Sequence, residues 1–211
     1  MLYNFLLNFV EVFTFLNVFK YITFRVGLAV FTSLLIVLII GGPFIKFFSE
    51  RKILDPIRED GPGEHIIKKI GTPTMGGVII LLALIISVLL WADLKNIYIL
   101  FCLYIVTSFG LLGAYDDYKK IIKSSSSGIS SRFKMIMQII LALLGLIILT
   151  YFVEYQEFKN LYFPFFKNLT LHLGLFFIPF AIFIIVGSSN AVNLTDGLDG
   201  LATVPVMLVA L

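Results

Sequence analysis

The sequence contains few charged residues and almost no cysteine. Only 14% of its 211 residues are charged, whereas 59% are hydrophobic and the mean hydropathy is +1.01. These values exclude a soluble domain and indicate an integral membrane protein. The single cysteine, Cys102, excludes an intramolecular disulfide and a cysteine-based metal or redox motif. The net charge of +3 is small and divided among loops, so nothing in it indicates nucleic acid binding.

The sequence also lacks the features of a cleaved signal peptide. Residues 1–23 have no basic segment at their start, contain Glu11, and are not followed by a cleavage site of small residues. We therefore expect this segment to be retained. Its many aromatic residues are interspersed with Asn, Glu and Lys. This composition predicts a helix over residues 1–23 that lies along the membrane interface.

Five apolar runs are candidate membrane spans, which typically contain about 17 to 25 apolar residues. They cover residues 24–48, 76–91, 97–115, 135–152 and 171–186. A sixth run begins near Leu201 and is still apolar at Leu211, so we expect the sequence to be cut within a helix. No barrel-type alternation is present. The predicted fold class is therefore all-α, with one polytopic transmembrane helix bundle over residues 1–211.

The placement of lysine and arginine predicts the orientation of this bundle. Most of the 16 basic residues follow the first and third runs. They are Lys46, Arg51, Lys52, Arg58, Lys68, Lys69, Lys119, Lys120, Lys123, Arg132 and Lys134. By the positive-inside rule, these two connections are cytoplasmic and the N-terminus is outside. Residues 190–200, which follow the fifth run, are then expected on the cytoplasmic face as well.

Three polar segments therefore share one predicted membrane face. They are residues 58–77, Tyr115-Asp-Asp-Tyr-Lys-Lys120, and Asn190-Ala-Val-Asn-Leu-Thr-Asp-Gly-Leu-Asp-Gly200. Polar groups of this density at the edge of a hydrocarbon layer are costly to place and are usually functional. Their carboxylates, amides and lysines suit the binding of a phosphorylated substrate together with a divalent cation.

The first two segments also have simpler interpretations. Asp116 and Lys120 are spaced to form an i,i+4 ion pair at an ordinary helix end. Adjacent carboxylates repel each other, however, so Asp116 and Asp117 together favour a bound cation. Gly71-Thr-Pro-Thr-Met-Gly-Gly77 is either a loop or a ligand contact, and it lacks the residue order of a P-loop. Gly76 and Gly77 would permit close helix packing as readily as ligand approach.

The third segment does not fit a calcium-binding EF-hand, because Val192 and Leu194 fall where oxygen ligands belong. A helix-capping loop remains an alternative. Its polar residues recur every third position, at Asn190, Asn193, Asp196 and Asp199. Each step of three turns about 60° around an α-helix. Either the glycines break the helix or these residues belong to separate subsites, and we favour separate subsites. Asn193 and Asp196 are then expected near a phosphate or metal, and Asp199 near another part of the ligand.

Gly71-Thr-Pro-Thr-Met-Gly-Gly77, Tyr115-Asp-Asp-Tyr-Lys-Lys120 and the segment from Asn190 to Ala202 occur in the order that is characteristic of one family. In these motifs the chain resembles the bacterial phospho-N-acetylmuramoyl-pentapeptide transferases. The segment Leu16-Asn-Val-Phe-Lys-Tyr-Ile-Thr-Phe-Arg25 and Asp60-Gly-Pro with His65 are also similar. The resemblance covers essentially the whole chain.

The resemblance implies an enzyme of peptidoglycan synthesis in the bacterial cytoplasmic membrane, with its active site on the cytoplasmic face. Such an enzyme uses Mg²⁺ to transfer phospho-N-acetylmuramoyl-pentapeptide from its UDP conjugate to undecaprenyl phosphate, which yields lipid I and UMP. We also expect a homodimer. The implied catalytic residues are Asp116, Asp117, Lys120 and Lys134. Asp117 is also the implied metal ligand, and the substrate-binding residues are Lys69, Thr74, Asn190, Asn193, Asp196 and Asp199, with His65 as a secondary candidate.

Two other functions remain open. A related transferase would use a UDP-GlcNAc type donor and a polyprenyl phosphate acceptor. An ion-coupled transporter would instead place its carboxylates deep within the spans, whereas these lie at predicted span ends. Members of the resembled family continue beyond this length, with a later metal-binding aspartate and a histidine-rich loop. We therefore expect the 211 residues alone to be inactive, and lipid I formation by the purified chain would overturn this expectation.

Overall fold

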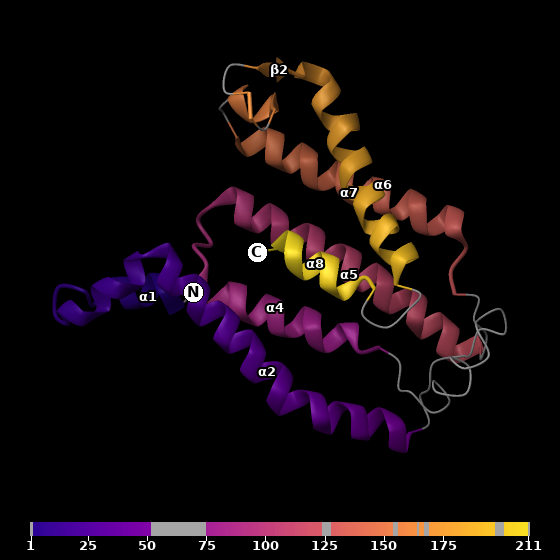
Figure 1. Ribbon diagram of the computed structural model, residues 1–211, viewed down its shortest axis with the longest axis horizontal. Helices are drawn as coiled ribbons and strands as arrows, with labels where there is room; N and C mark the ends of the chain where they lie inside the picture. The colour runs from indigo at the N-terminus through magenta and orange to yellow at the C-terminus, as the bar shows by residue number, and fades with distance from the viewer. Residues whose placement is uncertain are drawn as a thin grey trace. The chain divides into compact units, whose positions relative to one another are not determined.

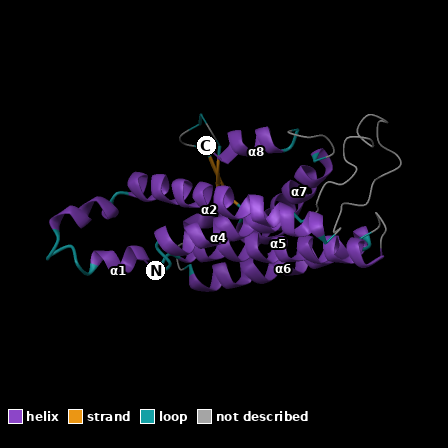
Figure 2. Cartoon of the chain, turned by 90° about the horizontal axis from the view of Figure 1, so that it is seen from below, coloured by secondary structure: helices purple, strands orange, loops and turns teal. Residues whose placement is uncertain are grey.

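A computed structural model describes residues 2–51, 75–123, 128–153, 156–163, 165–166, 169–196 and 201–210 of the chain. The chain divides into two compact units, Met1–Lys134 and Met135–Leu211. Helices account for most of the described residues, as the purple ribbons of Figure 2 show. The predicted all-α class is confirmed.

The first unit is built around three long apolar helices. These are α2 (Ile22–Glu50), α4 (Gly77–Trp91) and α5 (Ile97–Lys123). Figure 1 shows α4 between the other two, and it packs against both. Gly110 of α5 allows one close approach, because a Cβ there would lie 2.5 Å from Leu81 Cδ2 of α4. Small residues at helix contacts have this role in membrane proteins.

The single helix predicted over residues 1–23 is instead two short helical segments. They are α1 (Leu2–Leu7) and the 3₁₀-helix η1 (Thr14–Lys20). Aromatic contacts hold this part of the chain to the helices. The Phe19 ring stacks on Trp91 at 5.9 Å between centroids, and the Arg25 guanidinium lies 4.0 Å from the centre of the Tyr3 ring. The segment before α2 is thus held by contacts with α2 and with Trp91 of α4.

The second unit contains a β-hairpin that the sequence analysis did not predict. It contains most of α6 (Ser131–Phe152), the 3₁₀-helices η2 (Gln156–Lys159) and η3 (Gly174–Phe176), α7 (Phe177–Thr195) and α8 (Thr203–Ala210). Between α6 and α7, β1 (Asn160–Tyr162) pairs antiparallel with β2 (Thr170–His172), with Asn160 opposite His172. The predicted span over 171–186 is therefore wrong at its start. Leu171 pairs with Leu161 in the hairpin, and the helical segment begins only at Gly174.

Four helices among the described residues are long and apolar enough to cross a membrane. They are Ile22–Glu50, Ile97–Ile122, Ser131–Phe152 and Gly174–Thr195. They correspond to the first, third, fourth and fifth predicted spans. The second predicted span forms α4, whose 15 residues extend about 22 Å at 1.5 Å per residue. This length is less than the roughly 30 Å of a typical hydrocarbon core.

A buried polar contact joins α6 to α7 within the second unit. Gln138 is only 3% exposed. Asn190 Nδ2 donates to Gln138 Oε1 at 2.8 Å and to the Val186 carbonyl oxygen at 2.8 Å. Gln138 Nε2 in turn donates to Ser189 Oγ at 3.4 Å. Ala142, Gly145, Leu146 and Leu149 extend the same buried stripe along α6.

We expect loss of the Gln138 amide to loosen the contact between α6 and α7. The Gln138→Leu variant keeps the side-chain size but leaves Asn190 without its partner on α6. Interhelical hydrogen bonds in membrane proteins contribute roughly 0.6 kcal/mol on average. A double-mutant cycle with Asn190→Leu, measured by unfolding in detergent, should give a coupling energy of this order. Strictly additive effects would show that the pair does not stabilise the unit.

Candidate functional site

Two carboxylates of α5 converge on one lysine. Lys120 Nζ lies 2.9 Å from Asp116 Oδ2 and 2.9 Å from Asp117 Oδ1. These spacings of three and four residues place side chains on neighbouring positions of a helix surface. The predicted ion pair between Asp116 and Lys120 is confirmed, and Asp117 joins it. The helix continues through this cluster to Lys123, beyond the predicted end at residue 115.

The two aspartates differ in their exposure. The Asp116 side chain is 12% exposed, whereas that of Asp117 is 37% exposed. A carboxylate that served only as a head-group anchor would lie at the surface, so the burial of Asp116 argues against that simpler interpretation. Asp117 is the better placed of the two to meet a ligand that arrives from solvent. The pair thus offers one carboxylate held within the protein and one that faces outward.

A backbone group from the segment after α5 completes the surroundings of Asp116. The Ile129 N–H donates to Asp116 Oδ1 at 2.7 Å. Gly128 lies directly against the same carboxylate. Lys134, in the first turns of α6, is close enough to interact electrostatically with Asp116. Of the four predicted catalytic residues, the structure therefore gathers Asp116, Asp117 and Lys120 in direct contact and places Lys134 nearby.

The predicted cluster at residues 190–200 begins inside α7. That helix ends at Thr195, and the Asp196 N–H donates to the Val192 carbonyl oxygen at 3.1 Å. Asn193 and Asp196 are exposed, whereas Asn190 is partly buried and bonded to Gln138. The described members of the cluster therefore separate into one residue that joins helices and two that face outward. Asp199 lies outside the described residues.

The remaining predicted site residues are Lys69, Thr74 and His65. All three lie outside the described part of the chain. The described part of this motif begins at Met75, whose φ of 67° is uncommon for a residue with a side chain. A Cβ at Gly76 or Gly77 would meet no described atom within 4 Å. Close helix packing therefore does not explain these two glycines in the part of the chain that is described.

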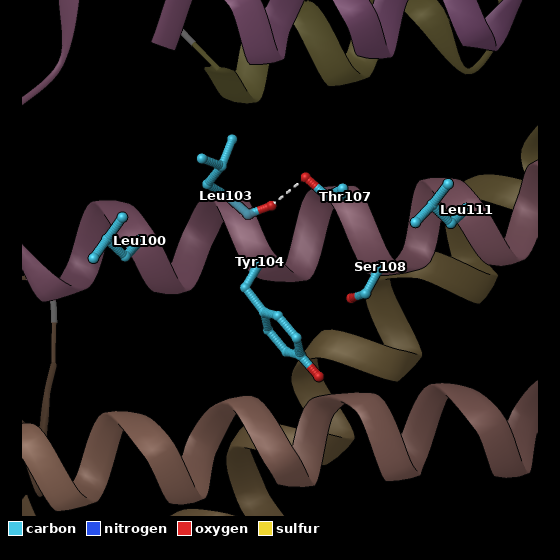
Figure 3. A pocket seen from close by; sticks show the side chains of 6 residues that line it. All are labelled: Leu100, Leu103, Tyr104, Thr107, Ser108 and Leu111. Atoms are coloured by element: carbon cyan, nitrogen blue, oxygen red, sulfur yellow. Dashed lines mark hydrogen bonds between the residues drawn. The ribbon is translucent and has the colours of Figure 1, made fainter. Parts of the chain in front are cut away.

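A pocket of about 410 Å³ lies along α5. It is lined by Leu100, Leu103, Tyr104, Thr107, Ser108 and Leu111 (Figure 3). Thr107 Oγ1 donates to the Leu103 carbonyl oxygen at 2.6 Å, and Ser108 Oγ donates to that of Ile105 at 3.1 Å. Both hydroxyl protons thus satisfy the backbone of α5 itself. The lining is otherwise mainly apolar and contains no charged group for phosphate chemistry.

Among the residues that the structure describes, the potential metal ligands in contact with Lys120 are the carboxylates of Asp116 and Asp117. Within the described ranges, no group of three or more His, Cys, Asp or Glu side chains is positioned to hold a metal ion. Asp116 and Asp117 nevertheless supply carboxylate oxygens, which are the ligands that Mg²⁺ prefers. Magnesium commonly uses one or two protein carboxylates and completes its shell with water and substrate phosphates. The donor set on α5 fits such a shared site.

Three residues that hold predicted site residues in place were not predicted from the sequence. Gly128 and Ile129 contact Asp116, and Gln138 contacts Asn190. Ile129 acts through its backbone N–H, which no sequence motif reveals. Gln138 carried a usable signal, because an amide within an apolar span is costly unless it has a partner.

The chain is similar in sequence to known transferases. Residues 96–211 match glycosyl transferase family 4, and residues 69–81 match phospho-N-acetylmuramoyl-pentapeptide-transferase signature 1. Proteins named phospho-N-acetylmuramoyl-pentapeptide-transferase are similar over most or all of the chain. The one from Pelagibacter ubique is 67% identical over 100% of the chain, and that from Rickettsia felis is 50% identical over 100%. The one from Caulobacter vibrioides is 46% identical over 92%.

The chain spans 58% of the length of the Pelagibacter and Rickettsia relatives and 54% of the Caulobacter relative. The resemblance drawn from the sequence motifs is confirmed. The family match includes α5 with its aspartate pair and α7 with the asparagine and aspartate cluster. On this basis the chain belongs to glycosyl transferase family 4.

Proposed function

We propose that the protein transfers phospho-N-acetylmuramoyl-pentapeptide from its UDP conjugate to undecaprenyl phosphate, and so forms lipid I and UMP. The observation that carries this proposal is the contact of Lys120 with both Asp116 and Asp117 at 2.9 Å. The signature match at residues 69–81 and the names of the relatives favour the muramoyl-pentapeptide donor. The broader family match is also compatible with a UDP-GlcNAc type donor.

The proposed reaction exchanges one phosphorus–oxygen bond for another. An oxygen of undecaprenyl phosphate bonds to the sugar-linked phosphorus of the donor. The bond from that phosphorus to the UMP oxygen breaks, and UMP leaves with the electron pair. The attacking phosphate is already anionic, so the main barriers are charge repulsion and alignment. Groups that neutralise and orient phosphates are therefore expected to provide most of the catalysis.

The charged residues of α5 suit these tasks. Lys120 neutralises phosphate oxygens as it exchanges its contact with the aspartates for one with substrate, and Lys134 assists from α6. Asp116 positions the lipid phosphate or acts as its base, with Asp117 beside it. By resemblance, Lys69, Thr74, Asn193, Asp196 and Asp199 line the nucleotide-sugar pocket, with His65 as a secondary contact. Asn190 supports that pocket through its bond to Gln138.

We further propose that Asp117, as the more exposed carboxylate, holds Mg²⁺ together with substrate phosphates. When bound, the cation lowers the repulsion between the two phosphates and polarises the phosphorus that is attacked. The chain's own residues orient the reactants around it. We place the site on the cytoplasmic face of the bacterial inner membrane, because the basic connections lie at that face by the positive-inside rule. We propose a homodimer as the assembly.

The donor distinguishes the two candidate transferase functions. We expect the full-length gene product in membranes to release UMP from UDP-N-acetylmuramoyl-pentapeptide when undecaprenyl phosphate is added. UDP-GlcNAc should give little release under the same conditions. Release from UDP-GlcNAc alone would favour the N-acetylhexosamine-1-phosphate transferase. No UMP release from either donor, in membranes that contain the folded protein, would reject both functions.

We expect the Lys120→Gln variant to lose roughly 100-fold in kcat, which is typical of removing one group that stabilises developing charge. Lys119→Gln is the matched control. Its ammonium lies 5.2 Å from the centre of the Tyr115 ring, and its neighbour Lys120 makes the contacts with the aspartates. The measurement is UMP release at saturating substrates, with the unfolding midpoint as a check on folding. Equal losses in the two variants would argue against a specific role for Lys120.

Removal of divalent cations by a chelator should abolish UMP release, and added Mg²⁺ should restore it. The Asp117→Asn variant should need a higher Mg²⁺ concentration for half-maximal activity, because an amide is a weaker ligand than a carboxylate. Asp93→Asn makes the same chemical change outside this cluster, at a residue whose Oδ1 accepts from the Lys95 N–H. An unchanged Mg²⁺ requirement in Asp117→Asn would remove this residue from the proposed metal site.

A further inference from the structure

Gly128 touches the carboxylate of Asp116 so closely that no side chain fits between them. A Cβ placed on Gly128 would overlap Asp116 Oδ1 and would lie 2.7 Å from Cγ and 3.1 Å from Oδ2. Real Cβ atoms essentially never lie within 3.0 Å of an atom from elsewhere in the fold. Asp116 cannot easily move away, because it is a short, mostly buried side chain on a helix and Lys120 and Ile129 both hold it.

The backbone conformation does not explain this glycine. Among the described glycines, only Gly174 has a positive φ. Gly128 therefore adopts a conformation that other residues also tolerate. Gly113, one helical turn before Asp117 on α5, offers a contrast, because a Cβ there would meet nothing within 4 Å. The contact with Asp116 is what requires the absence of a side chain at position 128.

This close approach brings the next backbone N–H onto Asp116 and makes the two carboxylate oxygens different. Oδ1 accepts from Ile129 N–H at 2.7 Å. That donor is part of the main chain and cannot leave without moving the whole segment. Oδ2 contacts Lys120 Nζ at 2.9 Å. That donor ends a long flexible side chain, which can turn toward a phosphate.

We propose that Gly128 is a positioning residue for Asp116. The missing side chain lets the Ile129 N–H anchor Oδ1, so that Oδ2 is the oxygen presented to the reacting phosphate or its cation. The catalytic half of this inference rests on the proposed transferase function. The contact itself does not, and it can be tested separately. A fixed carboxylate matters for rate, because a misplacement of about 1 Å can cost roughly 100-fold.

The test compares Gly128→Ala with Gly113→Ala in the full-length gene product. For Gly128→Ala we expect kcat for UMP release to fall roughly 100-fold, with KM for the UDP donor nearly unchanged. Gly113→Ala should keep the parental kcat and KM. A parental kcat in Gly128→Ala would overturn the proposal, and so would a loss confined to KM.

A thermal double-mutant cycle tests the contact without relying on activity. Gly128→Ala should lower the unfolding midpoint in the parental protein but have little effect in the Asp116→Ala background, where the colliding carboxylate is absent. An equal loss in both backgrounds, or no loss in either, would overturn the proposal even if kcat falls. If the parental protein releases no UMP, the transferase function fails, while the cycle still decides whether Gly128 and Asp116 are coupled.

Discussion

Pairing of polar groups in apolar surroundings is the constraint on which both described units depend. A charge or amide removed from water is costly unless a partner within the protein replaces the solvent. In the first unit, Lys120 lies between Asp116 and Asp117, and the Ile129 N–H occupies the remaining oxygen of the buried aspartate. Two adjacent carboxylates on one helix would otherwise repel each other. The lysine makes that arrangement stable, and it is the cation that we propose to meet a substrate phosphate.

The same constraint has a different result in the second unit. There, Gln138 and Asn190 satisfy each other across two apolar helices. Asn190 therefore helps to hold α6 and α7 together, while Asn193 and Asp196 remain exposed further along α7. Residues that recur at every third position of one helix therefore lie in two different environments. The residue deeper in the helix joins α6 to α7, and those at its end are exposed.

Much of the helical organisation and part of the site could be predicted from particular residues. The continuous apolar runs predicted helices at α2, α5, α6 and α7, because a chain in hydrocarbon must satisfy its backbone groups internally. The i,i+4 spacing predicted the contact between Asp116 and Lys120. The hairpin could not be predicted, because Leu171 is as apolar as the residues of a span and its pairing with Leu161 depends on contacts distant in sequence. The division of residues 1–23 into α1 and η1 was not predicted either, and the contact of Phe19 with Trp91 in this region also joins residues that are distant in sequence.

The sequence by itself determined that this is a helical membrane protein, which charged motifs it carries, and which family it belongs to. Hydropathy and motif order are properties of the chain alone, so they need no knowledge of its folded form. Only the tertiary structure decided that Gly128 lies against Asp116 and that Ile129 anchors one of its oxygens. A backbone N–H has no residue-specific signature, and the absence of a side chain acquires meaning only when another group occupies the space beside it.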